Sequence, residues 1–198
     1  MTKNQIEFGG SDEAALAYIR KRGYCSYGSM VNVRDKREPS NFSSTAQDFG
    51  KELHSRFLEH KKLKTLTPEE ENMLKEMVHN LAEDYMVQRL MESAKVEQEF
   101  DTTINGLRMF GRIDILTFAV ADLKTTRLNK LAPFVASMDL LQAAIYKRAT
   151  KKKEFYYIGT SKVPPYIPIV FSTASYPGLM HQADQELDYY SKYIKRKL

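Results

Sequence analysis

The chain has 198 residues, 42% hydrophobic and 28% charged, a composition typical of a globular domain that is long enough to bury a core. It contains no apolar run of membrane-spanning length and no signal-peptide pattern, so we expect a cytoplasmic protein without a membrane partner. Its one cysteine, Cys25, excludes a disulfide within the chain, a cysteine-rich zinc site and a four-cysteine iron–sulfur cluster.

The net charge of +5 permits a polyanionic partner without requiring one, so the placement of the basic residues matters more than their number. Two clusters stand out: Lys147, Arg148, Lys151, Lys152 and Lys153 in one, and Lys192, Lys195, Arg196 and Lys197 in the other. We interpret the C-terminal cluster as a solvated face. The first cluster begins directly after candidate site residues on a helix, and we interpret it as facing phosphates.

The N-terminal third is expected to be helical with one long loop. Ser11 is placed to cap a short helix that continues through about Arg22, and residues 23–43 are predicted to form a loop. A second helix is predicted to begin at Ser44, where Gln47 completes a capping box.

A third helix start is Thr67-Pro68-Glu69-Glu70, which combines an N-cap, a first-turn proline and an acidic third position. A stripe of Met and Leu extends this helix towards Ala94 and is expected to be core. Residues 96–101 then alternate between polar and apolar, and Asn105-Gly106 is the dipeptide preferred in two-residue hairpin turns.

The rest of the chain is expected to alternate strands with helices. The predicted elements are strands at 107–116 and 119–124, a helix at 134–149, strands at 154–161 and 167–173, and a helix at 179–196. This order predicts an α/β fold with a central mixed β-sheet flanked by helices. We expect a single domain over 1–198, with a helical part at about 1–95, a sheet core at about 96–173 and the C-terminal helix.

The strongest chemical signal is a pair of carboxylates, Asp114 and Asp122, in two apolar strands joined by a short turn. A buried carboxylate is costly unless it meets a cation or several hydrogen bonds. Neighbouring strands would let the two carboxylates converge, which suits Mg²⁺ or Mn²⁺. Lys124, two residues after Asp122, should point to the same sheet face and could orient an attacking water. A second acidic-x-Lys triplet, Glu59-His60-Lys61, lies in a charged helical end with no strand before it, and we discard it.

Two helices carry further polar candidates. Gly50 and His54 lie one turn apart on a mostly apolar helix, where a lone His is more often a core residue than a ligand. Gln142 and Tyr146 lie one turn apart on a later helix, where the alternative is a polar helix edge.

These motifs occur in one order along residues 44 to 173: Gly-x-x-x-His, Gly-x-x-Asp, Asp-x-Lys-Thr and Gln-x-x-x-Tyr. The combination resembles the RecB-like branch of the PD-(D/E)XK nuclease superfamily, which has a restriction-endonuclease-like core. The segments Leu66-Thr67-Pro68-Glu69-Glu70 and Lys162-Val163-Pro164-Pro165-Tyr166 add a likeness to phage exonucleases of the RecE and lambda-exonuclease kind. Two departures are the short spacing of seven residues between Asp114 and Asp122 and the absence of the cluster-binding cysteines that some RecB-like nucleases carry.

The resemblance implies a role for each matching residue. It implies metal ligation by His54, Asp114, Asp122 and the Leu123 backbone carbonyl, with Asp114, Asp122 and Lys124 as the catalytic set. It also implies DNA contacts by Gln142 and Tyr146, to which we add Thr125, Lys147 and Arg148. Either Glu97 or Glu99 could join as an outer-shell carboxylate.

The resemblance therefore implies a Mg²⁺- or Mn²⁺-dependent deoxyribonuclease that hydrolyses phosphodiester bonds from DNA ends, in phage or bacterial recombination or repair. Its partners would be DNA, a single-strand annealing or recombination protein, and further copies of the chain. Two alternatives stay open: a non-catalytic nucleic-acid-binding module that retains the fold, and an endonuclease of the same superfamily.

Overall fold

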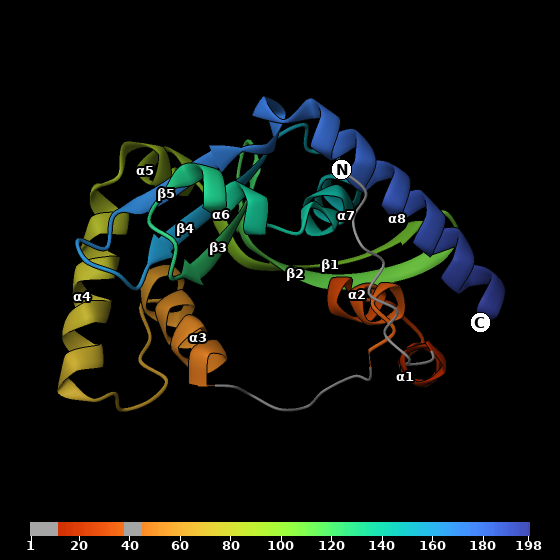
Figure 1. Ribbon diagram of the computed structural model, residues 1–198, viewed down its shortest axis with the longest axis horizontal. Helices are drawn as coiled ribbons and strands as arrows, with labels where there is room; N and C mark the ends of the chain where they lie inside the picture. Colours follow the sequence, from red (N-terminus) through yellow and green to blue (C-terminus); the bar gives the residue numbers. More distant parts are fainter. Residues whose placement is uncertain (1–11, 38–44) are drawn as a thin grey trace.

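The computed structural model describes residues 12–37 and 45–198, with the side chains of residues 45–47 left out (Figure 1). Its centre is a five-stranded sheet in the order β1-β2-β3-β4-β5. Neighbouring strands are antiparallel except for β3 and β4, which run parallel. The strands are β1 (Lys95–Ile104), β2 (Leu107–Leu116), β3 (Val120–Thr126), β4 (Phe155–Ser161) and β5 (Pro168–Ser172). This arrangement confirms the predicted α/β fold with a mixed sheet.

Helices cover both faces of this sheet, and each face has its own hydrophobic cluster. One cluster contains Ile113, Val120 and Tyr157 and is covered by α1, α2, α7 and α8. The other contains Ile115 and Leu123 and is covered by α3, α4 and α5. The helices are α1 (Glu13–Arg22), α2 (Tyr27–Arg34), α3 (Thr45–Leu58), α4 (Pro68–Glu83), α5 (Tyr85–Met91), α6 (Leu131–Ser137), α7 (Leu140–Thr150) and α8 (Pro177–Lys197).

The β1–β2 hairpin turns at Asn105 and Gly106, as predicted. Both residues have positive φ, 51° and 77°, as a type I′ turn requires. Glycine adopts such angles without a steric penalty, and asparagine tolerates them better than most residues. The hairpin holds one register along nearly its whole length, from Lys95 opposite Leu116 to Ile104 opposite Leu107.

By contrast, β2 and β3 pair only briefly. Just two residue pairs join them, Ile115 with Ala121 and Leu116 with Val120. Beyond these pairs the strands diverge, and Figure 1 shows the β1–β2 hairpin curving towards α8, away from β3 to β5. The divergence leaves a fork at the level of Asp114 and Asp122, where the Leu123 backbone hydrogen-bonds to side chains instead of to β2.

The N-terminal prediction was partly wrong. The predicted loop over 23–43 contains α2, which Ser26 caps by accepting a hydrogen bond from the Ser29 backbone N–H at 3.2 Å. Met30 and Val33 are its buried anchors, a spacing that a Gly-, Ser- and Tyr-rich sequence obscured. The proposed caps at Ser11 and Ser44, the second with Gln47, lie outside the described residues and side chains.

Two predicted continuous helices are each divided in two. The helix predicted from Thr67 towards Ala94 stops at Asp84, which is extended and caps α5 by accepting from the Val87 N–H at 2.9 Å. The helix predicted at 134–149 is interrupted by extended residues at Met138 and Asp139, and the Asp139 carboxylate caps α7. Aspartate competes with helical backbone hydrogen bonds in this way because its side chain reaches the nearby N–H groups. None of the described helices is long and apolar enough to cross a membrane.

Candidate active site

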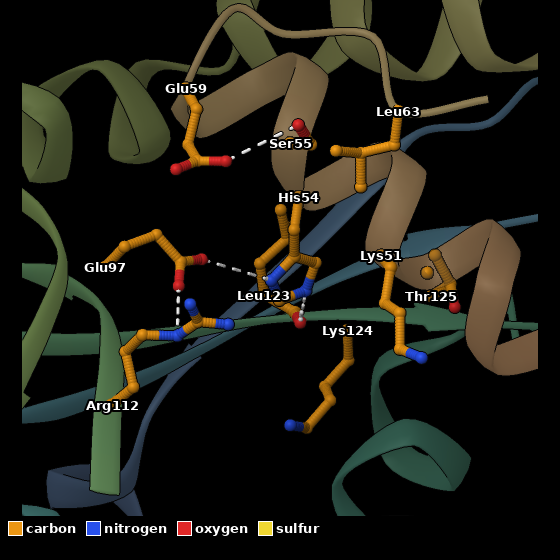
Figure 2. A pocket seen from close by; sticks show the side chains of 11 residues that line it. Lys51, His54, Ser55, Glu59, Leu63, Glu97, Arg112, Leu123, Lys124 and Thr125 are labelled. Carbon is orange, nitrogen blue, oxygen red and sulfur yellow. Dashed lines mark hydrogen bonds and ion pairs between the residues drawn. The ribbon is translucent and has the colours of Figure 1, made fainter. Parts of the chain in front are cut away.

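A close contact between α3 and β3 positions His54. A Cβ atom on Gly50 would lie 3.4 Å from Thr125 Oγ1, so the absence of a side chain lets the helix approach the end of the strand. One turn further along α3, His54 Nε2 lies 2.6 Å from the Leu123 carbonyl oxygen (Figure 2). His54 therefore lies against the backbone of β3 and is only partly buried, unlike a core residue.

Two carboxylates approach the other ring nitrogen of His54. Its Nδ1 atom lies 3.6 Å from Asp114 Oδ2 and 3.9 Å from Glu97 Oε1. One ligand atom from each of these three residues lies within 4.8 Å of the others. Among the described residues they form a group able to hold a metal ion.

Glu97 owes its place to an irregular backbone. Its φ is 50°, which is unusual for a residue with a side chain and costs about 1–3 kcal/mol. The β1–β2 pairing skips Glu97 and Asp114, although the pairs on either side keep the register that would place them opposite each other. Glu99, the alternative that the sequence left open, is exposed and lies outside the group.

Asp122 occupies a different position from Asp114. Its side chain is 2% exposed, and its two oxygens are 2.5 Å from Gln142 Nε2 and 2.6 Å from Lys124 Nζ. Asp122 is therefore held by an amide and an ammonium rather than facing His54. Lys124 lies on the same sheet face as Asp122, as predicted from its spacing.

The charges at the fork are strongly coupled. Burial and the neighbouring Asp122 carboxylate raise the pKa of Asp114 to about 7, although it accepts a 2.8 Å hydrogen bond from the Leu123 N–H. Burial opposes the charged forms of His54 and Lys124, but the surrounding carboxylates more than offset it and raise the pKa of each group. The hydrogen bond with His54 and the charge of Arg112 lower the pKa of Glu97. The fork therefore concentrates negative charge that attracts cations.

Several of these groups line a pocket of about 860 Å³. His54, Glu97 and Lys124 line it together with Arg112, whose Nε lies 2.6 Å from Glu97 Oε2. Figure 2 shows the His54 ring between Glu97 and the Leu123 carbonyl oxygen, with the Lys124 side chain below that oxygen in this view. A further lining residue is Lys51, and both Arg112 and Lys51 were missed from the sequence. Arg112 lies inside the Gly-x-x-Asp motif, two residues before Asp114, which is the signal that could have found it.

The predicted DNA-contacting residues have different surroundings. Thr125 lines the pocket. Gln142 and Tyr146 are buried, and the Tyr146 hydroxyl donates to the Arg112 carbonyl at 3.0 Å. Arg148 forms ion pairs with Asp184 and Asp188 of α8. Lys147 is partly buried near the end of α7. A DNA-contacting role for these residues stays a prediction.

Comparison with solved structures places this fold among known ones. The structure of a putative exonuclease from Eubacterium rectale matches with a TM-score of 0.54 and 17% identity, over 100% of this chain and 89% of that one. A second match, LHK-Exo in complex with dAMP, has a TM-score of 0.40 and 12% identity over 94% of each chain. No protein-family model and no curated protein matches the sequence. The first match shows a shared fold.

Proposed function

We propose that the chain is a metal-dependent deoxyribonuclease whose active site lies at the fork between β2 and β3. The observation that carries this proposal is the convergence of His54, Glu97 and Asp114 beside the Asp122–Lys124 pair. The sequence motifs resemble those of RecB-like PD-(D/E)XK nucleases, and the Eubacterium rectale protein that shares the fold is named a "putative exonuclease".

The residues at the fork fit a divalent cation. Both ring nitrogens of His54 face oxygen atoms, which belong to Leu123 on one side and to Asp114 and Glu97 on the other. All of these oxygens are acceptors when the carboxylates are ionised, so a doubly protonated imidazole, or a cation between the ring and the carboxylates, would match them. Carboxylate and carbonyl oxygens suit Mg²⁺, and an added imidazole favours Mn²⁺.

Each residue would have a distinct role. His54, Glu97 and Asp114 would hold the cation, and Asp122 and the Leu123 carbonyl are further candidates from the sequence. When bound, a divalent cation lowers the pKa of a water molecule and offsets the charge of a phosphate. Lys124, held by Asp122, would orient the water and stabilise charge developing on the phosphate oxygens. Gln142 would fix the Asp122 carboxylate and, through it, Lys124.

The test is incubation of linear duplex DNA with the protein and Mn²⁺ or Mg²⁺, with and without EDTA. The proposal expects degradation that requires the metal and stops with EDTA. A folded protein that binds DNA but never cleaves it would instead be the second candidate, a non-catalytic binding module.

We further propose that the enzyme acts from DNA ends. A base-reading endonuclease needs an element that enters the major groove. The link between β2 and β3 is only Thr117 to Ala119, closed by a 2.9 Å backbone hydrogen bond, so it holds no such element. Recombination or repair in a bacterium or phage, with an annealing or recombination protein as partner, is the setting that the motif resemblance favours.

A further inference from the structure

The pocket lies at one end of the parallel strand pair, and this fixes which cations are near it. Lys124 and Thr125, near the end of β3, line the pocket. The β3–β4 pairing runs from Val120 with Phe155 to Thr126 with Ser161. The cluster at Lys151–Lys153 precedes β4 and so lies at the opposite end of this pair from the pocket.

Two other cations leave the sheet at the pocket end. Arg127 and Lys162 each follow the last residue of their strand, one step beyond the pair Thr126 and Ser161. The Lys162 backbone N–H donates to the Thr126 carbonyl at 2.7 Å, which holds the two chain segments side by side. Paired strands lie about 4.8 Å apart, so the two cations emerge next to each other.

The Lys162 side chain extends onto α3, towards the pocket. Its Nζ lies 4.3 Å from the centre of the Phe49 ring. Phe49 directly precedes Gly50 and Lys51, which both line the pocket. The surface at this end of the sheet therefore carries Lys51 at the pocket, with Lys162 and Arg127 where β4 and β3 end.

This surface has more positive charge than its neighbours neutralise. No ion pair joins Arg127 or Lys162 to a carboxylate within the described part of the chain. Burial and the charge of Arg127 lower the pKa of Lys162, and Glu70 offsets this only in part. The ion pair of Lys51 with Asp48, at 3.7 Å, is exposed and weak. Adjacent cations that nearby carboxylates neutralise only in part are the pattern expected where an anion binds.

We propose that Lys51, Arg127 and Lys162, which we term the strand-end cations, bind the phosphate backbone of the DNA strand that enters the active site. The inference rests on the proposed nuclease function. Phosphate contacts position a nucleic acid without reading its sequence, and three separate cations suit that task. Lys51 lines the pocket, and Arg127 and Lys162 lie at the same end of the β3–β4 pair, so a strand held by these cations would lie near the metal group.

The experiment measures the salt dependence of DNA binding. A fluorescently labelled linear duplex is titrated with protein in EDTA at a series of KCl concentrations, and thermal unfolding is recorded for every variant. Replacing Arg127 and Lys162 with Gln should reduce the slope of log K against log [KCl] by about two units, since each phosphate contact contributes nearly one. The charge-matched control, Lys192→Gln with Arg196→Gln, should retain the wild-type slope.

Each other outcome has a defined meaning. The proposal would be overturned if the wild type binds DNA and the Arg127/Lys162 variant keeps the wild-type slope. It would also be overturned if the slope falls only in a variant that combines Lys151→Gln with Lys153→Gln. If the double variant does not fold, the two single variants should each reduce the slope by about one unit. Wild-type protein that binds DNA but never cleaves it refutes the nuclease function and leaves this test intact. Absence of DNA binding overturns this proposal, and the cleavage assay with Mn²⁺ or Mg²⁺ decides the nuclease function separately.

Discussion

At the scale of single residues, Glu97 shows how an irregular backbone selects one side chain. Glu97 and Glu99 are two apart in β1 and would share a face in a regular strand. The positive φ of Glu97 instead coincides with the skipped pair and with its approach to His54 and Asp114. Strained residues of this kind concentrate at functional sites, which agrees with a metal-holding role.

Replacing Glu97 with Gln should therefore weaken metal use, whereas Glu99→Gln, the same change on an exposed neighbour, should not. We expect Glu97→Gln to raise the Mn²⁺ concentration for half-maximal cleavage by about 10- to 100-fold, the usual cost of losing a supporting group at a metal site. A Mn²⁺ titration of the cleavage rate measures this. Equal Mn²⁺ requirements in the two variants would remove Glu97 from the site.

Gln142 supports the other buried carboxylate, and its loss should affect both stability and activity. Gln142→Leu leaves Asp122 Oδ1 without its amide donor in a buried setting, at an expected cost of about 1–3 kcal/mol. Tyr146→Phe removes one hydrogen bond to a backbone carbonyl and should cost about 0.5–1.5 kcal/mol. Urea unfolding and cleavage rates are the readouts. Wild-type stability and activity in Gln142→Leu would contradict the positioning role.

At the scale of elements, α3 is anchored to the loop after it by a buried carboxylate. Glu52 is 0% exposed and accepts from Arg56 Nε at 2.7 Å and from the Lys64 N–H at 3.0 Å. It also lies 3.2 Å from the Leu63 N–H. Glu52 is two residues before His54, and Leu63 lines the pocket, so this anchor fixes the helix that carries His54.

Arg56→Met should loosen this anchor because it leaves a buried carboxylate without its cation. We expect unfolding to become easier by about 3 kcal/mol, the lower end for breaking a buried pair, since two backbone donors remain. The control Lys62→Met removes a partly exposed pair with Glu71 and should cost less than about 1 kcal/mol. An unchanged urea midpoint for Arg56→Met would contradict the anchor.

The same arginine predicts a pH dependence. Its hydrogen bonds lower the pKa of Glu71 from 4.5 to about 2. A lowered native pKa stabilises the fold above the unfolded pKa, and this contribution is lost as the pH falls through the native value. The stability difference between wild type and Arg56→Met should therefore narrow as the pH falls from 4.5 towards 2. A difference that stays constant over this range would contradict the pairing.

At the scale of the whole molecule, the site combines five elements, and two of them, α3 and α7, lie far from each other in sequence. The side chains come from α3, β1, β2, β3 and α7, and they meet because β2 and β3 diverge. Hydrophobic periodicity predicted the strands and the sheet class, and motif spacing predicted the Asp122–Lys124 pair. Neither signal predicted the positive φ of Glu97 or the helix breaks at Asp84 and Asp139, because these depend on tertiary contacts and side-chain capping. The partners of Gln142 and Arg148 likewise depend on helix packing.

The short β2–β3 link makes a prediction about substrates. An enzyme without a base-reading insertion there should need a DNA end. Covalently closed circular duplex should survive conditions, with Mn²⁺ or Mg²⁺, that consume the same plasmid after linearisation. Equal loss of the closed circle would indicate an endonuclease and would leave the metal site unaffected.

The most direct test of the account is Asp114→Asn on end-labelled linear duplex with Mn²⁺. The amide keeps an oxygen for the Leu123 N–H and removes one of two neighbouring carboxylates, so thermal stability should be equal or higher. Cleavage should fall by about 100-fold or more, because a metal-held water supplies several kcal/mol to the reaction. A folded Asp114→Asn protein that cleaves at the wild-type rate would contradict the assignment of the active site.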